Sequence, residues 1–334
     1  MAISFARWLC ASAIAVAGGL AGCANAPIAS QASVDAHVQR ARSIAGDDLQ
    51  YLLPTCLPQP AERARSPAIE ALLKKVMAQT PPDPQQVFDN LYYVGSAWVS
   101  AWVLKTSDGL ILIDALNNAE EAQTLIEGGM ARLGLNPKDI KYLIVTHGHG
   151  DHYGGAISLV SKYGMRVVAS EIDWQMMESG LEFDAPSWGR PPQRDIAVRD
   201  GDRITLGDTT MTFYVTAGHT LGTVSPSFPV KDRQNTYQAL MWGGTSFNFG
   251  RDLGRLDLYA GAASRMVQLT QTIPFDLLLS NHPGWDNTIK KIAMRKDNPN
   301  GQHPFLSGRE GVQRSMRVLE ACSLAQKDRF LMKP

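Results

Sequence analysis

The chain lacks an excess of charge of either sign, because its 32 lysine and arginine residues balance its 32 aspartate and glutamate residues. No basic surface is therefore available to hold a nucleic acid or an anionic membrane, and we expect neither as a partner. A small-molecule substrate fits this balance better. With 44% hydrophobic and 19% charged residues in 334, the sequence also excludes a disordered chain and allows one large domain or two small ones.

Long apolar runs are absent beyond the first 23 residues, so we expect no later segment to span a bilayer. Near the N-terminus, Arg7 precedes an apolar run over residues 8–20, which is typical of a secretory signal. The run ends in Leu-Ala-Gly before Cys23, which resembles the bacterial lipobox, where the cysteine is acylated. We expect a signal peptide over residues 1–22 and a periplasmic protein whose only membrane attachment is lipid on Cys23, in the outer membrane. A soluble periplasmic protein is the alternative.

Cysteine is scarce, with four residues in the chain. Cys10 lies in the expected signal and Cys23 in the lipobox, so Cys56 and Cys322 are the two cysteines of the mature protein. In an oxidising compartment these two can form a disulfide that joins an N-terminal segment to the C-terminal helix. Two buried free thiols are the alternative.

Composition divides the mature chain into three parts. Residues 23–35 are rich in alanine, serine and asparagine and indicate a flexible tether. Residues 36–84 are expected to form a helical extension packed on the main domain. It has helical patterns near residues 34–45 and 66–79, the second capped by Ser66 and beginning at Pro67. Residues 85–330 form the main domain.

Strands and helices alternate through the main domain. The apolar patterns of its first half predict strands near 87–95, 97–106, 110–116, 141–146 and 165–170, and helices near 119–133, 153–164 and 171–180. An Asp-Gly pair at 108–109 indicates a hairpin turn. The second half predicts strands near 203–207, 210–220, 222–230, 236–244 and 275–284, and helices near 256–271 and 308–328. This order predicts an α/β protein with two facing sheets and helices outside, a four-layer αββα sandwich.

The strongest chemical signal is the segment Thr-His-Gly-His-Gly-Asp-His at residues 146–152, where an apolar strand ends. It places His147, His149, Asp151 and His152 within six residues, a density that burial in a helix or strand does not explain. Imidazole and carboxylate groups are zinc ligands, and the two intervening glycines let the backbone fold tightly around an ion. The segment therefore predicts a zinc site.

Further ligands must come from elsewhere, because one short loop cannot surround two metal ions. His219 and His282 each follow an apolar strand and lie near a glycine, as ligands on loops should. His37 and His303 lack this context, and we expect both to be ordinary surface residues.

The pattern HxHxDH, followed by Gly-His-Thr and a distal histidine, resembles the metallo-β-lactamase superfamily over roughly residues 85–328. The resemblance implies a metallo-β-lactamase fold and two Zn²⁺ ions. Carried over by motif position, one zinc is held by His147, His149 and His219, and the other by Asp151, His152 and His282. Thioesterases, lactonases, phosphodiesterases and ribonucleases share this motif, so it indicates the fold more strongly than the substrate.

An absence narrows the choice within the superfamily. Many members that are not lactamases place a metal-bridging aspartate at the end of the strand between the last two histidine ligands. Here that strand ends in Gly243-Gly244, with no carboxylate and without the cysteine ligand of one lactamase subclass. His147 excludes the subclass with asparagine at the first ligand position. What remains resembles the third subclass of metallo-β-lactamases, in which both metals use only histidine and aspartate.

The function implied by this resemblance is opening of the β-lactam ring of antibiotics, with a metal-bound hydroxide as the nucleophile. Asp151 would bind a metal and orient the hydroxide. Another di-zinc hydrolase, such as a lactonase or a thioesterase, is the alternative, and a non-catalytic lipoprotein scaffold is a further one. We expect a monomer.

Five further residues are candidates around the metals. Asp114 ends a strand beneath the metal loop, where it would hydrogen-bond that loop or cap the next helix. Thr245 and Ser246 would bind the substrate carboxylate or serve as turn residues. Phe183 and Trp188, in a proline-rich loop, would form an apolar wall over the site or pack inside the fold.

Overall fold

The computed structural model describes residues 29–62 and 67–332. The expected signal peptide, the expected lipidation at Cys23 and the expected helix cap at Ser66 lie outside these residues. Within the described ranges, no helix combines the length and the apolar character needed to cross a bilayer.

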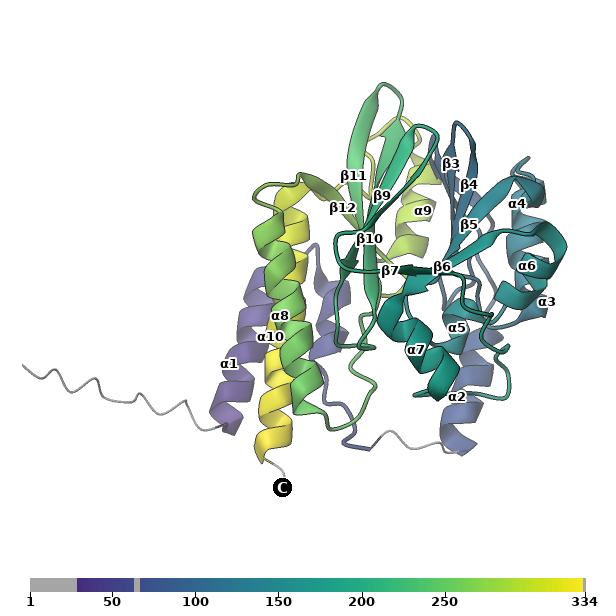
Figure 1. Ribbon diagram of the computed structural model, residues 1–334. Helices are drawn as coiled ribbons and strands as arrows, with labels where there is room; N and C mark the ends of the chain where they lie inside the picture. The colour runs from purple at the N-terminus through teal and green to yellow at the C-terminus, as the bar shows by residue number, and fades with distance from the viewer. Residues whose placement is uncertain (1–28, 63–66, 333–334) are drawn as a thin grey trace, which may run out of the picture.

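Two β-sheets form the centre of the molecule (Figure 1). The larger sheet contains β1 (Gln85–Phe88), β2 (Leu91–Tyr93), β3 (Trp102–Thr106), β4 (Gly109–Ile113), β5 (Ile140–Ile144), β6 (Arg166–Ser170) and β7 (Ile196–Val198), paired in that order. The smaller sheet contains β8 (Arg203–Leu206), β9 (Thr209–Val215), β10 (Val224–Asp232), β11 (Asn235–Trp242) and β12 (Phe275–Ser280), in the order β12-β11-β10-β9-β8.

Pairing changes direction once in each sheet. Strands β1 to β4 are antiparallel and β4 to β7 are parallel, while the smaller sheet is antiparallel except for the pair β11 and β12. The predicted Asp-Gly turn joins β3 to β4, and Gly109 there has a φ of 138°, which residues with a Cβ rarely adopt. Parallel pairing brings the carboxyl ends of β4, β5 and β6 to one edge of the larger sheet.

Alternation along the strands divides the apolar side chains among three cores. In β4, Ile111 and Ile113 face the smaller sheet, whereas Leu110 and Leu112 face a layer of helices. That layer contains α3 (Ala119–Glu121), a π-helical segment η2 (Ala122–Glu127), α4 (Gly128–Arg132), α5 (Gly150–Tyr153), α6 (Ala156–Tyr163) and α7 (Glu171–Ser179). A 3₁₀ turn, η3 (Pro137–Asp139), leads into β5.

The third core lies between the smaller sheet and a second helical layer. This layer contains α1 (Gln31–Ala45), η1 (Gln50–Cys56), α8 (Leu253–Leu269) and α10 (Gly308–Met332), which run side by side in Figure 1. Cys56 and Cys322 form a disulfide between η1 and α10. Arg314 donates to the carbonyl oxygens of Ile44 and Ala45 from α10. The layers are therefore helix, sheet, sheet and helix, the arrangement predicted from the sequence.

Several details differ from the prediction, among them the following four. Helix α1 begins at Gln31, capped by Ser30, so residues 31–35 are helical and the expected tether is wrong there. The single helix expected near 119–133 contains the π-helical segment. Helix α9 (Thr288–Asp297) was not predicted; it is short and rich in charged residues, although Ile289 and Ile292 have helical spacing. His303 is not a surface residue: it is buried, stacks on Phe88 and hydrogen-bonds the Val87 carbonyl oxygen.

Candidate metal centre

Three strand ends supply the clustered histidines. Strand β5 runs into the loop that carries His147 and His149, and α5 then places Asp151 and His152 on its first turn. The loop is tied between the two sheets, because Val145 donates to the Val168 carbonyl in β6 and Val224 of β10 donates to the Thr146 carbonyl. His219 follows β9 and His282 follows β12.

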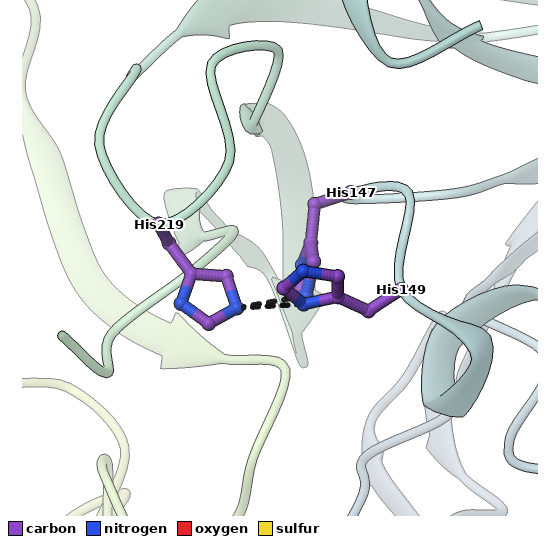
Figure 2. A group of neighbouring side chains, drawn as sticks. All are labelled: His147, His149 and His219. Atoms are coloured by element: carbon purple, nitrogen blue, oxygen red, sulfur yellow. Dashed lines mark hydrogen bonds between the residues drawn. The ribbon is translucent and has the colours of Figure 1, made fainter. Parts of the chain in front are cut away.

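His147, His149 and His219 form the first group (Figure 2). Nε2 of His219 lies 3.0 Å from Nε2 of His147 and 3.2 Å from Nδ1 of His149. All three rings are buried, and their nitrogens point at one another from two different loops. Three converging imidazole nitrogens are the donor set of a zinc site.

Asp151, His152 and His282 form the second group. Oδ2 of Asp151 lies 3.5 Å from Nε2 of His152 and 3.6 Å from Nε2 of His282, and these two nitrogens are 3.3 Å apart. His147 lies between the groups, since its ligand atom is also within 4.8 Å of those of Asp151 and His152. The six residues predicted from the sequence thus converge as two adjacent groups.

The outward-facing ring nitrogens have fixed partners. Nδ1 of His147, His219 and His282 lies 2.8, 2.7 and 2.7 Å from the carbonyl oxygens of Gly243, Ser246 and Trp98, respectively. A carbonyl oxygen can only accept, so each Nδ1 carries the proton and donates it. Each Nε2 then presents a lone pair toward its group, which is the tautomer that binds a metal.

Asp114 holds both the ring of His152 and the loop that carries His147 and His149. Its buried carboxylate accepts hydrogen bonds from the Thr146 amide at 2.8 Å and hydroxyl at 2.9 Å, and from His152 Nδ1 at 2.8 Å. It does not cap a helix, because Asn118 caps α3. Asp114 therefore lies beneath the loop and orients His152.

Burial and charge favour the metal-binding forms of His147, His282 and Asp151, and they draw a positive charge to His152. Burial and the neighbouring imidazoles lower the pKa of His147 well below its usual value and that of His282 to about 4. Burial opposes ionisation of Asp151, but the charge of His152 holds the pKa of Asp151 below its usual range. Burial also disfavours charge on His152, yet Asp151 and Asp114 raise its pKa to about 10. The two carboxylates thus attract positive charge at this point, as a proton or as a metal ion.

The residues fit a bound metal. Oδ1 of Asp151 is buried and has no hydrogen-bond partner among the described residues, although a buried carboxylate oxygen is costly to leave unpaired. A metal or its water ligand would satisfy it. Neutral imidazoles and one ionised carboxylate are ligands that suit zinc, so the centre implies a bound metal ion.

A cavity of about 310 Å³ opens above the two groups. Phe183, Trp188 and Ser246 line it as expected, and the rings of Phe183 and Trp188 meet edge-on with centroids 5.1 Å apart. The expectation for Thr245 is wrong. Its side chain is buried with its hydroxyl 3.4 Å from that of Ser280, and it does not line the cavity.

Sequence reasoning missed the residues that support His219 from outside. The guanidinium of Arg255, on α8, donates to the carbonyl oxygens of Gly218 and His219 and pairs with Glu182 at 3.0 Å. Oε2 of Glu182 in turn lies 3.8 Å from Nε2 of His149. Burial disfavours a charged Glu182, but His149 and Arg255 lower its pKa to about 2. Nothing in the local sequence distinguishes this arginine from those on exposed helix faces.

Asp173 was also missed. On α7, its carboxylate accepts hydrogen bonds from the amides of Gly148 and Gly222 at 2.8 and 3.0 Å and from the Thr220 hydroxyl at 2.8 Å. It is 1% exposed, and burial raises its pKa to about 6. Asp173 therefore links the loop that carries His147 and His149 to the loop that follows His219.

Comparison with known proteins agrees with this geometry. Residues 99–233 match the family described as the metallo-beta-lactamase superfamily. The chain is similar to BJP-1, a subclass B3 metallo-beta-lactamase of Bradyrhizobium japonicum, with 32% identity and a TM-score of 0.63, covering 73% of this chain and 92% of that one.

Curated relatives match over shorter lengths. Exodeoxyribonuclease WalJ of Streptococcus pneumoniae is 34% identical over 80 residues, covering 24% of this chain and 28% of the relative. Hydroxyacylglutathione hydrolase of Synechocystis sp. is 32% identical over 130 residues, covering 39% and 44%. The chain thus matches less than half the length of these two relatives. Together with the two groups of clustered ligand residues and the similarity over most of the length of BJP-1, these findings show that the chain belongs to the metallo-β-lactamase superfamily and has the fold of its hydrolases.

Proposed function

We propose that this protein is a zinc-dependent β-lactamase that opens the lactam ring of antibiotics. It holds two zinc ions, one on His147, His149 and His219 and one on Asp151, His152 and His282. Similarity to a subclass B3 enzyme over most of that enzyme's length supports the proposal. The local match to a hydroxyacylglutathione hydrolase makes a thioester the alternative substrate, with a lactone as a related one.

The packing of Gly244 is the observation that carries the proposal. A Cβ atom added at Gly244 would lie 2.6 Å from Cβ of His219 and 2.8 Å from its ring atoms Cγ and Cδ2. No side chain fits there without moving His219. The bridging aspartate of non-lactamase members, expected near this strand end, therefore has no room at Gly244, and Asp151 is the one carboxylate in the two ligand groups.

The remaining roles follow from the chain's own groups. Zinc bound here supplies a Lewis acid that polarises a carbonyl and lowers the pKa of water to about 7. Oδ1 of Asp151 is buried and has no hydrogen-bond partner among the described residues, so it is the oxygen that would accept a hydrogen bond from the attacking water and orient it. Ser246 and Asn248 line the cavity and offer polar groups to a substrate carboxylate.

A chromogenic cephalosporin tests the proposal. We expect turnover by the zinc-loaded protein, loss of turnover with a chelator and recovery on adding zinc. Asp151→Asn should reduce turnover by about 100-fold or more, since it removes a ligand and the water-orienting oxygen. Asp47→Asn, a change at an exposed site in the extension, is the matched control and should leave turnover unchanged.

Two outcomes would overturn the proposal. Hydrolysis of a thioester or a lactone, with no zinc-dependent turnover of any lactam, would establish the alternative substrate class. Less than one zinc per chain after gentle purification, with no hydrolysis of any substrate, would favour a non-catalytic scaffold instead.

We also propose that the protein is a monomer, exported and held at the outer membrane through lipid on Cys23. Cys23→Ser should then move it from the detergent phase to the aqueous phase on phase separation. An unchanged distribution would favour the soluble periplasmic alternative.

A further inference from the structure

Helix α2 (Pro67–Met77) belongs to the N-terminal extension but contributes to the metal cavity. Its residues Ile69, Leu72 and Leu73 line the cavity together with the metal groups and the 183–188 loop. Spacing of three and four residues places these side chains on one face of the helix. In Figure 1, α2 lies at the end of the molecule where α5 and α7 lie, away from α1.

The chain is anchored on both sides of α2. Before it, the Ala61 carbonyl accepts a hydrogen bond from the Arg251 amide at 2.7 Å, and Gln59 bonds the side chain of Gln326. After it, Asp83 pairs with Arg132 at 2.8 Å, and the chain then enters β1 of the larger sheet. The residues before and after α2 thus contact two different layers of the fold.

Leu72 is 57% exposed although it borders the cavity. An apolar side chain in this position gains little from the fold itself, whereas a ligand that covers it removes its surface from water. The opposite side of α2 carries the exposed Lys74 and Lys75. The helix therefore presents its apolar face to the cavity and its charged residues to solvent.

The facing walls are aromatic. Trp98, Phe183, Trp188 and Trp285 line the same cavity, and the ring of Trp98 lies 5.4 Å from that of His282. Polar groups are confined to the metal residues and to the Ser246 side, so the ligand that matches this cavity has a metal-seeking polar group beside a bulky apolar one.

We propose that α2 is a specificity element of this site. Its leucines form an apolar wall that selects ligands with an aromatic or branched aliphatic substituent next to the group that reaches the metals. The inference about substrates rests on the proposed function, and it states that the enzyme prefers lactams with an apolar acyl side chain. The inference about binding rests on the cavity alone.

A pair of thiols tests the wall without turnover, because a thiolate is a zinc ligand. The zinc-loaded protein is titrated calorimetrically with thioglycolate and with 2-mercapto-3-phenylpropanoate, which adds a benzyl group. We expect wild-type protein to bind the phenyl compound more tightly. Leu72→Ala should reduce that preference about fivefold and Leu72→Ala with Leu73→Ala about tenfold or more, while thioglycolate affinity stays unchanged.

Leu258→Ala is the matched control, because Leu258 is 47% exposed on α8 and does not line the cavity. It should leave both affinities unaltered. An equal preference for the phenyl compound in wild type and the double variant, with circular dichroism unchanged, would overturn the proposal.

The same variants separate this inference from the proposed function. Cephalosporins with an aromatic and a small acyl side chain are compared by kcat/KM, and the double variant should lose about tenfold in the ratio. Absence of any lactam turnover, with thiol discrimination retained, would refute the proposed function and leave the apolar wall standing. Lactam turnover with no preference between the two thiols or between the two lactams would refute the proposal about α2 and leave the proposed function standing.

Discussion

Replacement of Asp114 by asparagine tests how the second metal group is oriented. Asp114 has a φ of 61°, a left-handed conformation that asparagine tolerates as well as aspartate does, so the change preserves both shape and backbone. The asparagine oxygen can still accept from the Thr146 amide. Its NH₂ group would then replace the oxygen that lies 2.8 Å from His152 Nδ1, placing two donors opposite each other.

His152 relieves this conflict by moving its proton to Nε2. That nitrogen faces His282 at 3.3 Å and is the atom needed for the metal, so the lone pair is lost. Loss of an oriented partner of a metal-binding histidine typically weakens metal binding by about 10–100-fold, or roughly 1.4–2.8 kcal/mol. A hydrogen bond to a charged group contributes a similar amount, about 1.5–3 kcal/mol.

Competition with a chromogenic zinc chelator measures this effect. We expect Asp114→Asn to lose about 10–100-fold in affinity for one zinc and to keep the affinity for the other, since the three-histidine group does not contact Asp114. Asp200→Asn changes an exposed carboxylate paired with Arg265 and should leave both affinities unchanged. Two unaltered zinc affinities in folded Asp114→Asn would refute the assigned role of this carboxylate.

Three further predictions follow from the packing. Gly244→Ala should lower zinc content and turnover by at least about tenfold, because the added Cβ would lie 2.6 Å from a metal-binding imidazole. Gly261→Ala is its control, with no atom within 4 Å of the added Cβ, and equal activity of both variants would contradict the argument. Burial raises the pKa of Asp173 to about 6, so the folded state binds its proton more tightly than the unfolded state. Stability should therefore fall by about 3 kcal/mol as pH rises from about 4 to 6, and urea unfolding of metal-free Asp173→Asn should lack that decline. Cys322→Ser removes the disulfide that joins the extension to α10, and it should lower the free energy of unfolding by about 2–4 kcal/mol under oxidising conditions. Equal unfolding midpoints of the oxidised wild type and the variant would show that the bridge contributes nothing.

The layered fold was predictable because its signals are local. Strand alternation, as in Leu110 to Ile113, assigns each side chain to one face, and the Asp-Gly turn at Gly109 fixes the hairpin. The metal residues were predictable for a similar reason, since four of them lie within six positions and the other two follow apolar strands. Asp114 was found because it ends a strand adjacent to the metal strand.

The residues that shape and support the site gave no such signal. In the sequence, Leu72 and Leu73 indicate only an ordinary amphipathic helix. Their place beside the cavity depends on tertiary contacts that no local pattern reveals. Asp173 and Arg255 lie on helices where a polar residue usually faces solvent, and only the tertiary arrangement buries one and directs the other at a loop carbonyl. His303 was misjudged because stacking on an aromatic ring is a long-range contact.

The packing of α1 and η1 on α10 has a consequence for how the protein folds. Arg314 and the Ile44 carbonyl that it contacts are separated by 270 positions, so the helical layer over the smaller sheet joins segments made early and late in synthesis. The larger sheet and its helices are built from nearer neighbours and can assemble first. Until α10 emerges, its part of the apolar core over the smaller sheet stays uncovered, and this is the surface on which folding chains would associate with one another.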